Sequence, residues 1–382
     1  MLKAYVFLGP KLVVNILLFS IVFFMNILFI IPTLRTGGAE KMLVELLPQL
    51  KREGVNCSLL LFDREKTHFS TLLENEDIQI HYTARKSFFN LLNVMTFLNV
   101  IFSSKYDIIH CHLTYSQFWI ALVSFFNFRG KKLITTEHSS NNRRRGNRFL
   151  CYVDKFIYSR FHRIISISEA VQNSLLGWIK PRNVSKYVVI ENCIDVKKFS
   201  NATPVLRSEF GMDDKDIILI MVGRMTEAKD QACIIKALTL LGDEYKAILV
   251  GDGDTLEGNR ALAREWGVER RVYFAGERND IPNVLQVSDI YIQASHWEGL
   301  PTAPLEAMAA HKPTIGADVP GIRDVLSQKM LYRHSDFEDL ADLVLRVSSV
   351  NDIDSLLKEQ QQILKRFDLT NIVKKHLEIY RK

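Results

Sequence analysis

The chain contains 382 residues, of which 47% are hydrophobic and 24% are charged, with a modest net charge of +6. These proportions are close to globular averages, so they exclude collagen-like, disordered and disulfide-scaffold chains. The length is sufficient for two domains of ordinary size, each with its own core. The cysteines are odd in number and lack a C-x-x-C pair, which favours a reducing cytosol over a disulfide framework or a zinc site. They are Cys57, Cys111, Cys151, Cys193 and Cys233.

The first 24 residues form an apolar extension with two interpretations. The stretch 12–31 is almost continuously apolar and about as long as a membrane span. Its last part, 26–31, also has the pattern of a buried parallel strand followed by turn residues. Because Met25 directly precedes that strand, we favour Met25 as the functional start and residues 1–24 as an upstream extension. A non-cleaved membrane anchor is the alternative.

Beyond this extension, short apolar runs alternate with helical patterns, which is typical of parallel β-α-β layers. The first series of predicted strands is Ile27–Ile31, Cys57–Phe62, Ile78–His81, Ile108–His110, Lys132–Thr136, Arg163–Ile167 and Tyr187–Ile190. Predicted helices between them include Ala39–Glu53 and Phe88–Phe102. The second series of strands is Ile217–Val222, Lys246–Val250, Val272–Ala275, Ile290–Gln293 and Thr314–Ala317. The fold class is therefore α/β, with two separate parallel sheets.

Strand and helix periodicity lapses between residues 195 and 215, which places a domain boundary there. We expect an N-terminal domain over residues 25–200 and a C-terminal domain over residues 201–365. The final segment, 366–382, contains an amphipathic helix that should dock onto the rest of the molecule. Ligands of open parallel sheets bind beyond the carboxyl ends of the strands, so the residues after each strand are the candidates for chemistry.

A basic segment with interleaved aromatic residues lies between residues 141 and 163. Its basic residues are Arg143, Arg144, Arg145, Arg148, Lys155, Arg160 and Arg163, against the single acidic residue Asp154. This composition suits the surface of an anionic membrane. A solvated loop followed by an ordinary core helix is the alternative. No nucleic-acid partner is expected.

Gly37 and Gly38 follow the first predicted strand and precede a predicted helix. Glycines at this point would let the backbone approach a ligand, and the free N–H groups of the helix start would favour an anion. The segment is neither a Walker loop nor a G-x-G-x-x-G motif, and paired glycines before a helix are usually only a turn. Gly251 and Gly253, after a strand of the second series, indicate a turn that packs against or lines the site.

Arg224 and Lys229 follow the first strand of the second series. Both cations could converge on one diphosphate, with arginine supplying a bidentate fork and lysine a point charge. Alternatively, each is a solvated surface charge. Their place after a strand end favours the binding role.

The most specific segment is S-H-W-E-G-L-P-T-A-P-L-E, residues 295–306. Glu298 is predicted in the loop after a strand, and Glu306 at the start of the helix 305–310. The helix dipole alone would favour an acidic side chain at that position. The pairing of two carboxylates, with Gly299 shaping the loop between them, instead favours hydrogen bonds to the hydroxyls of a ribose or hexose.

Three histidines follow strand patterns in the first half: His110, His112 and His138. The His-x-His pair has no convincing third metal ligand, so positioning or core roles are favoured over a metal site. His138 lies just beyond a predicted strand, where it could bond a sugar hydroxyl or a developing charge.

Taken together, these motifs resemble the family-4 retaining glycosyltransferases of the glycosyltransferase-B fold, including enzymes of bacterial surface polysaccharides. The resemblance covers Met25 to the C-terminus. The motifs that carry it, in family order, are G-G-A-E at 37–40, D-I-I-H-C-H at 107–112, T-E-H at 136–138, S-I-S-E-A-V at 166–171, E-N-C-I-D-V-K-K-F at 191–199, G-R-M-T-E-A-K at 223–229 and E-x7-E at 298–306.

The resemblance implies two Rossmann-like domains facing a central cleft, with the C-terminal helix crossing back to the N-terminal domain. It also implies roles. Glu306 would bind the donor ribose, Glu298 the donor sugar, and Arg224 with Lys229 the diphosphate. The implied donor-binding residues are Gly37, Gly38, Arg224, Lys229, Glu298, Gly299, Leu300 and Glu306. The implied catalytic residues are His138, Glu298, Arg224 and Lys229.

The implied reaction moves a hexose-type sugar from a nucleotide-diphosphate sugar to a saccharide acceptor, with retention and without a metal ion or other cofactor. The acceptor is expected to be lipid-linked and the enzyme peripheral on the inner face of the cytoplasmic membrane, with Arg143, Arg144, Arg145 and Arg148 on the acceptor or membrane side. Ser139 and Cys193 depart from common family residues, which weakens inference about the sugar. A nucleotide-sugar 2-epimerase of the same fold and a non-catalytic nucleotide-sugar-binding protein are the alternatives.

Overall fold

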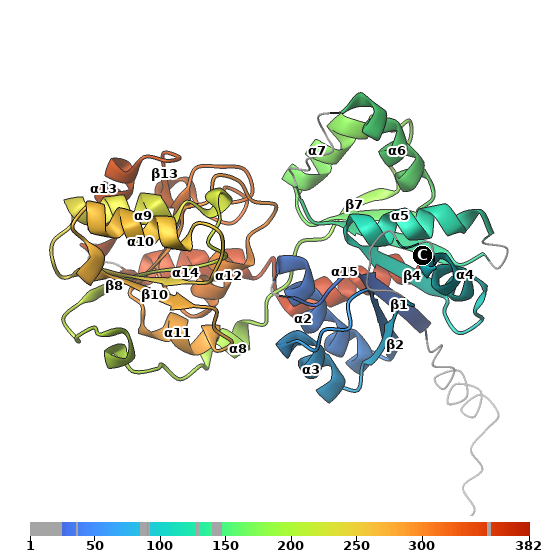
Figure 1. The fold of residues 1–382 in the computed structure, drawn as a ribbon, viewed down its shortest axis with the longest axis horizontal. Helices are drawn as coiled ribbons and strands as arrows, with labels where there is room; N and C mark the ends of the chain where they lie inside the picture. The colour runs from blue at the N-terminus through green and yellow to red at the C-terminus, as the bar shows by residue number, and fades with distance from the viewer. Residues whose placement is uncertain are drawn as a thin grey trace, which may run out of the picture.

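The structure is a computed structural model that describes residues 25–35, 37–84, 90, 92–126, 130–139, 147–349 and 353–382. Figure 1 shows two α/β lobes, one built mainly from the first half of the chain and the other from the second half. Each lobe is organised around its own parallel sheet. The two Rossmann-like domains predicted from the sequence are therefore confirmed. The predicted extension of residues 1–24 lies outside the described residues.

In the described part of the chain, the N-terminal sheet contains seven parallel strands in the order β3-β2-β1-β4-β5-β6-β7. The strands are β1 (Met25–Ile31), β2 (Val55–Leu61), β3 (Gln79–Tyr82), β4 (Ile108–His112), β5 (Lys132–Glu137), β6 (Arg163–Ser166) and β7 (Tyr187–Val189). The strand order reverses between β1 and β4. The carboxyl ends of these two strands therefore flank the crevice where open parallel sheets bind ligands.

Helices cover both faces of this sheet. They are α2 (Gly38–Arg52), α3 (His68–Asn75), α4 (Asn93–Phe102), α5 (Leu113–Val123), η1 (Ser124–Phe126), α6 (Arg148–Ser159) and α7 (Glu169–Ile179). Alternate residues of the central strand β1 face opposite cores, as the two-residue period of a strand requires. Ile27 and Phe29 join the core that contains α2, whereas Leu28 and Ile30 join the core that contains α4 and α5. Burial on both faces explains the continuous apolar sequence of β1.

Within the described residues, the C-terminal sheet contains six parallel strands in the order β10-β9-β8-β11-β12-β13. The strands are β8 (Ile217–Val222), β9 (Tyr245–Val250), β10 (Val272–Gly276), β11 (Ile290–Gln293), β12 (Thr314–Ala317) and β13 (Leu331–Tyr332). The strand order reverses between β8 and β11, so the loops after these two strands border the ligand crevice of this sheet.

The helical elements of the second half surround this sheet, and most of them share one hydrophobic core with it. They are α8 (Val196–Ser200), η3 (Arg207–Phe210), η4 (Glu227–Lys229), α9 (Gln231–Ala237), η5 (Leu238–Leu240), α10 (Leu256–Glu265), η6 (Glu269–Arg271), α11 (Ile281–Val287), α12 (Thr302–Ala309), η7 (Gln328–Met330), α13 (Phe337–Ser348) and α14 (Ile353–Leu364).

The last helix, α15 (Leu369–Arg381), returns to the N-terminal lobe, where Figure 1 shows it in red beside the blue helix α2. Its residues Ile372, Val373, Leu377 and Tyr380 are buried in the core that contains α2 and β1. The amphipathic pattern of the C-terminus therefore buries its apolar face against the first domain rather than the second.

Apart from shifts of up to two residues at strand ends, the structure differs from the sequence analysis at three elements. The predicted helix 88–102 appears as α4, which begins at Asn93 with Leu92 as its N-cap, and residues 85–89 and 91 lie outside the described residues. The short edge strand β13 was not predicted, since two residues carry too little pattern. The prediction that Glu306 begins a helix is wrong, because α12 begins at Thr302. No helix in the described residues is long and apolar enough to span a bilayer.

Candidate functional site

Glu298 lies in the loop after β11 and is held by a network of polar side chains. Its Oε1 accepts hydrogen bonds from Gln293 Nε2 at 2.9 Å and from Ser295 Oγ at 2.7 Å. The Lys229 ammonium lies 2.5 Å from the same oxygen and forms an ion pair with it. Gln293 and Ser295 are fully buried, and the Tyr291 hydroxyl donates to Gln293 Oε1 at 2.6 Å. The structure therefore brings Glu298 and Lys229 together and fixes the direction of the carboxylate.

Glu306 lies in the second turn of α12, and its side chain is only 3% exposed. Its Oε1 forms an ion pair of 2.6 Å with the Lys41 ammonium. Because Lys41 belongs to α2 of the N-terminal domain, this ion pair joins the two domains. The same ammonium lies 5.3 Å from the centre of the Phe199 ring. The stabilising partner of Glu306 is thus a lysine of the other domain, and not the helix N-terminus that the sequence suggested.

Arg224 follows β8 directly, is exposed, and faces the start of α2 across the domain boundary. Burial raises the pKa of Glu40 in the first turn of α2. A hydrogen bond from the Glu40 backbone and the positive charge of Arg224 act in the opposite direction and lower this pKa. A Cβ placed on Gly37 would collide with the Glu40 carboxylate, whereas a Cβ on Gly38 would meet nothing within 4 Å. Gly38 therefore borders open space at a helix N-terminus that Arg224 faces.

Gly299 brings the loop after β11 into contact with the N-terminal domain. A Cβ on Gly299 would lie 2.6 Å from the His138 carbonyl oxygen, a separation that real Cβ atoms do not show. Ser168 Oγ donates to the Gly299 carbonyl at 3.0 Å, and Asn192 Nδ2 donates to the Leu300 carbonyl at 3.2 Å. Glycine is thus required at position 299 for the two domains to meet beside His138.

His138 follows β5 and joins a buried group of histidines. Its Nε2 lies 3.0 Å from His112 Nδ1, and the His110 and His112 rings lie 4.4 Å apart between centroids. His110 bonds Thr136 Oγ1 through Nε2 and the Tyr380 hydroxyl through Nδ1, both at 2.8 Å. The predicted positioning or core roles of His110 and His112 agree with this geometry.

All of these histidines are held neutral. Burial lowers the pKa of His138 to about 4, and the pKa values of His110 and His112 lie well below the usual value because of burial and their histidine neighbours. Burial also lowers the pKa of His376, on α15, to about 3. At neutral pH His138 can therefore donate or accept a hydrogen bond, but it carries no charge.

Several glycines hold the loops of the C-terminal domain close together. Gly251 and Gly253 have positive φ, and a Cβ on either would collide with the carbonyl oxygens of Gly223 and Met225 respectively. These glycines therefore pack under the loop that carries Arg224, the packing role that the sequence suggested. Gly321, also at positive φ, packs in the same way against the Glu298 carbonyl, and no sequence pattern singled it out.

The remaining predicted residues lie away from this site or outside the description. Arg143, Arg144 and Arg145 lie outside the described residues, and Arg148 is exposed at the start of α6. All five cysteines are free. In the described ranges, no cluster of three or more His, Cys, Asp or Glu side chains is placed to hold a metal ion.

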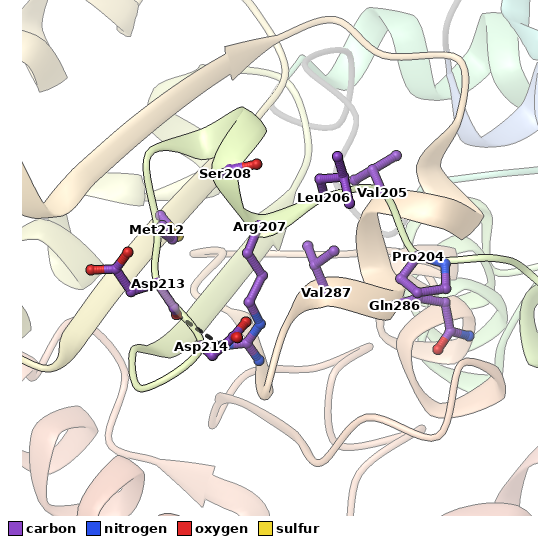
Figure 2. Close-up of a pocket in the computed structure, with 10 residues that line it drawn as sticks. All are labelled: Pro204, Val205, Leu206, Arg207, Ser208, Met212, Asp213, Asp214, Gln286 and Val287. Atoms are coloured by element: carbon purple, nitrogen blue, oxygen red, sulfur yellow. Dashed lines mark hydrogen bonds between the residues drawn. The ribbon is translucent and has the colours of Figure 1, made fainter.

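A separate pocket of about 550 Å³ lies at the linker between the domains (Figure 2). It is lined by Pro204, Val205, Leu206, Arg207, Ser208, Met212, Asp213, Asp214, Gln286 and Val287. The Arg207 guanidinium is already committed to Asp289, with two bonds of 3.1 and 3.2 Å. None of the predicted site residues lines this pocket, so it does not belong to the site.

Sequence reasoning missed Lys41, Gln293 and Ser295 at the site. Gln293 and Ser295 carried a signal, since a glutamine and a serine at the end of an otherwise apolar strand are buried polar groups that need partners. Lys41 carried none, because its partner Glu306 belongs to the other domain.

Two family models match the chain. The model described as Glycosyltransferase Family 4 matches residues 36–198, and the model described as Glycosyl transferases group 1 matches residues 203–363. Together they account for most of both domains, in the order that the structure shows. The chain belongs to the family-4 type of glycosyltransferases with the glycosyltransferase-B fold.

Individual proteins that are similar to this chain are also named as glycosyltransferases. The chain is 25% identical over 217 residues to the UDP-Gal:α-D-GlcNAc-diphosphoundecaprenol α-1,3-galactosyltransferase of Escherichia coli, covering 53% of this chain and 55% of that enzyme. It is 26% identical over 271 residues to EpsD of Bacillus subtilis, covering 67% of this chain and 71% of EpsD. The chain thus spans only about half the length of the Escherichia coli relative.

Among solved structures, HepE of Anabaena in complex with UDP and glucose superposes with a TM-score of 0.81 at 23% identity. The match covers 93% of this chain and 99% of HepE. This likeness shows that the chain has the same overall fold as HepE over both domains.

Proposed function

We propose that this glycosyltransferase moves a hexose from a nucleoside diphosphate sugar to a lipid-linked saccharide, with retention of anomeric configuration, in bacterial surface polysaccharide synthesis. One observation carries the proposal. The loop of Glu298 and Gly299 is held through the ion pair of Glu298 with Lys229. At Gly299 the same loop lies against His138 of the N-terminal domain. Groups suited to a diphosphate and to sugar hydroxyls thus converge where the two domains meet.

The donor is proposed to bind across the two domains. Glu306 would accept hydrogen bonds from the ribose hydroxyls, and Glu298 from the donor sugar. A uridine diphosphate sugar is the first candidate, because the Escherichia coli relative uses UDP-galactose and the solved structure of HepE contains UDP and glucose. The Glu298 carboxylate needs little reorganisation, since Gln293 and Ser295 already fix its direction.

The leaving group is proposed to be stabilised by fixed positive charge. Breaking the bond from the anomeric carbon to the diphosphate leaves negative charge on the phosphate oxygens. Arg224, Lys229 and the N-terminal end of the α2 dipole would stabilise that charge as it develops, without a metal ion. The open space beside Gly38 lets a phosphate or sugar approach this helix start.

The sugar is proposed to react through an oxocarbenium-like centre, with the acceptor hydroxyl attacking from the face that the diphosphate leaves. The departing phosphate would take the proton of the acceptor hydroxyl. Neutral His138 would contact the donor sugar near the reacting carbon, where it can bond a hydroxyl without adding charge. The contact between Gly299 and His138 would exclude water from this centre, which limits hydrolysis of the donor.

The acceptor side is proposed to meet an anionic membrane through α6 and η1, on the cytoplasmic face. Phe149 and Tyr152 are each 71% exposed on α6. Phe156 of α6 stacks on Phe125 of η1 at 5.6 Å, and the Arg160 guanidinium lies 4.6 Å from the Phe125 ring centre. Exposed aromatic rings beside basic groups suit the headgroup region of anionic lipids, and the Escherichia coli relative uses a diphosphoundecaprenol acceptor.

Substitutions at the donor site test the proposal. Glu306→Ala and Lys229→Ala are each expected to lower donor turnover about 100-fold, the usual cost of removing one group that stabilises the transition state. The measurement is product formation from UDP-sugars and a lipid-linked saccharide, with Glu265→Ala as a matched variant at an exposed position. Wild-type turnover in both donor-site variants would rule out this site. An epimeric sugar nucleotide formed without any acceptor would instead identify an epimerase.

A further inference from the structure

Lys41 lies between two carboxylates, of which only one belongs to the proposed donor site. Its ammonium is paired with Glu306 of α12 at 2.6 Å. Glu45 lies four residues later on α2, and side chains at this spacing share one face of a helix and reach each other. Lys41 can therefore contact Glu306 across the domain boundary or Glu45 on its own helix.

Glu45 has an unused acceptor. Its Oε1 atom is buried and has no hydrogen-bond partner among the described residues. A buried carboxylate oxygen without a partner is costly, so it has a strong tendency to take up a proton or a cation. The ionisable groups that act on it are Lys41, Glu306, Lys198, Asp195 and Cys193.

The Lys41 ammonium stands where the donor has to bind. Glu306 is only 3% exposed in this structure, and the ammonium occupies one of its two oxygens. A ribose whose two hydroxyls bond both carboxylate oxygens has to displace the ammonium from Oε1. A displaced ammonium that stays near the domain boundary needs a new counter-charge, and the Glu45 carboxylate, one turn later on α2, lies within its reach.

We infer that donor binding transfers the Lys41 ammonium from Glu306 to Glu45, so that Glu45 acts as a positioning residue that frees Glu306 for the donor. This inference rests on the proposed function, because it takes Glu306 as the ribose-binding group. It adds two residues to the donor site. Lys41 competes with the donor for Glu306, and Glu45 receives the displaced Lys41 ammonium.

Proton release follows from this transfer. Burial raises the pKa of Glu45 to about 7, with Lys41 lowering it and Glu306 raising it further. When the ammonium moves onto Glu45, the pKa of Glu45 falls and the bound proton leaves. The donor-bound protein then holds fewer protons than the free protein, so donor affinity rises with pH and levels off above pH 8.

Calorimetry with UDP-glucose on the full chain tests this. This probe is chosen because its diphosphate does not titrate near neutral pH. Titrations in buffers of different ionisation enthalpy should show release of up to one proton near pH 6.5, and affinity should rise roughly tenfold from pH 6 to pH 8. Binding without proton release and with equal affinity at both pH values would overturn the inference and leave the proposed function standing.

Two variants separate this transfer from a merely structural role. Glu45→Gln should bind UDP-glucose without proton release and with little dependence on pH, and its affinity at pH 8 should be severalfold weaker than that of the wild type. Glu53→Gln, at the exposed end of the same helix, should behave as the wild type. Wild-type proton release in Glu45→Gln would contradict the inference.

Lys41→Met removes the ammonium that competes with the donor, so this variant should not weaken donor binding. Without a competing ammonium, the variant should bind UDP-glucose at pH 6 at least as tightly as the wild type, and without proton release. A loss of affinity of tenfold or more at both pH values would show that Lys41 is a direct donor ligand, which overturns the inference. Failure of UDP-glucose to bind the wild type at any pH would instead count against the proposed uridine nucleotide donor.

Discussion

At the scale of single residues, the two carboxylates of the E-x7-E pair are prepared differently. Glu298 is fixed by three donors of its own domain and keeps a defined direction. Glu306 is paired with a lysine of the other domain, so that its ion pair depends on how the domains meet. Under the proposed function, the carboxylate that binds the donor sugar is therefore preorganised, whereas the carboxylate that binds the ribose has to exchange its partner.

Glu45 should make the stability of the protein depend on pH. Burial raises the pKa of this carboxyl to about 7, above its value in the unfolded chain. Its contribution to stability is therefore complete below about pH 4.5 and is lost as pH rises through 7. In Glu45→Gln this loss is absent, so the free energy of unfolding at pH 8 should exceed that of the wild type by on the order of 3 kcal/mol.

Urea denaturation at pH 5 and pH 8 measures this effect. All other titrating groups contribute alike to both proteins, so the comparison is between their two pH differences. The wild type should lose more stability than Glu45→Gln between the two values, and Glu53→Gln should follow the wild type. Equal pH differences in the wild type and Glu45→Gln would show that Glu45 is not held protonated in the folded state.

At the scale of elements, most of the sheet could be predicted because buried parallel strands are short apolar runs. β1 and β8 are continuous runs of this kind, and their ends were predicted to within two residues. The start of α12 was missed because Pro304 suggests a helix boundary, although a proline in the first turn costs no internal hydrogen bond.

The site could be predicted only in part. Residues that follow a strand end, such as Arg224 and Glu298, could be found because parallel sheets bring their carboxyl ends together. The pairing of Lys41 with Glu306 could not, since it depends on how two separate domains meet. The burial of Tyr380 beside His110 also depends on where the last helix docks, which its amphipathic pattern does not specify.

Helix α15 should be anchored by the Tyr380 hydroxyl. This hydroxyl lies 2.8 Å from His110 Nδ1 and 3.3 Å from His376 Nδ1 in a fully buried setting. Tyr380→Phe keeps the ring but leaves these nitrogens without that partner, so we expect a loss of about 1–3 kcal/mol in the free energy of unfolding. Urea denaturation at pH 7 measures this, with Tyr152→Phe on the exposed face of α6 as the matched variant. Unchanged stability of Tyr380→Phe would show that the bond is not formed.

At the scale of the whole molecule, the two domains meet through residues of the proposed site itself. Gly299 contacts His138, Ser168 bonds the Gly299 carbonyl, and Lys41 pairs with Glu306. Any change in how the domains meet must therefore alter the proposed donor site. The returning helix α15 adds a second link, since it follows α14 of the C-terminal domain and packs in the N-terminal core.

Attachment of the molecule to a membrane should depend on the basic segment of the N-terminal domain. Replacing Arg143, Arg144 and Arg145 by alanine removes three positive charges, and each basic group near an anionic surface contributes about 1 kcal/mol to binding. Cosedimentation with vesicles that contain anionic lipids should therefore fall at least tenfold, and more at low than at high salt.

The exposed aromatic residues of α6 test membrane attachment independently of charge. Phe149→Ala with Tyr152→Ala removes two exposed rings of α6 without changing charge, so vesicle binding should weaken at high salt as well as at low salt. The matched variant Trp266→Ala changes an aromatic residue of the C-terminal domain and should bind vesicles as the wild type does. If neither the arginine nor the aromatic variant alters binding, then α6 does not face the membrane. Loss of binding in both, with turnover of a soluble acceptor unchanged, would show that this face positions the enzyme and takes no part in the chemistry.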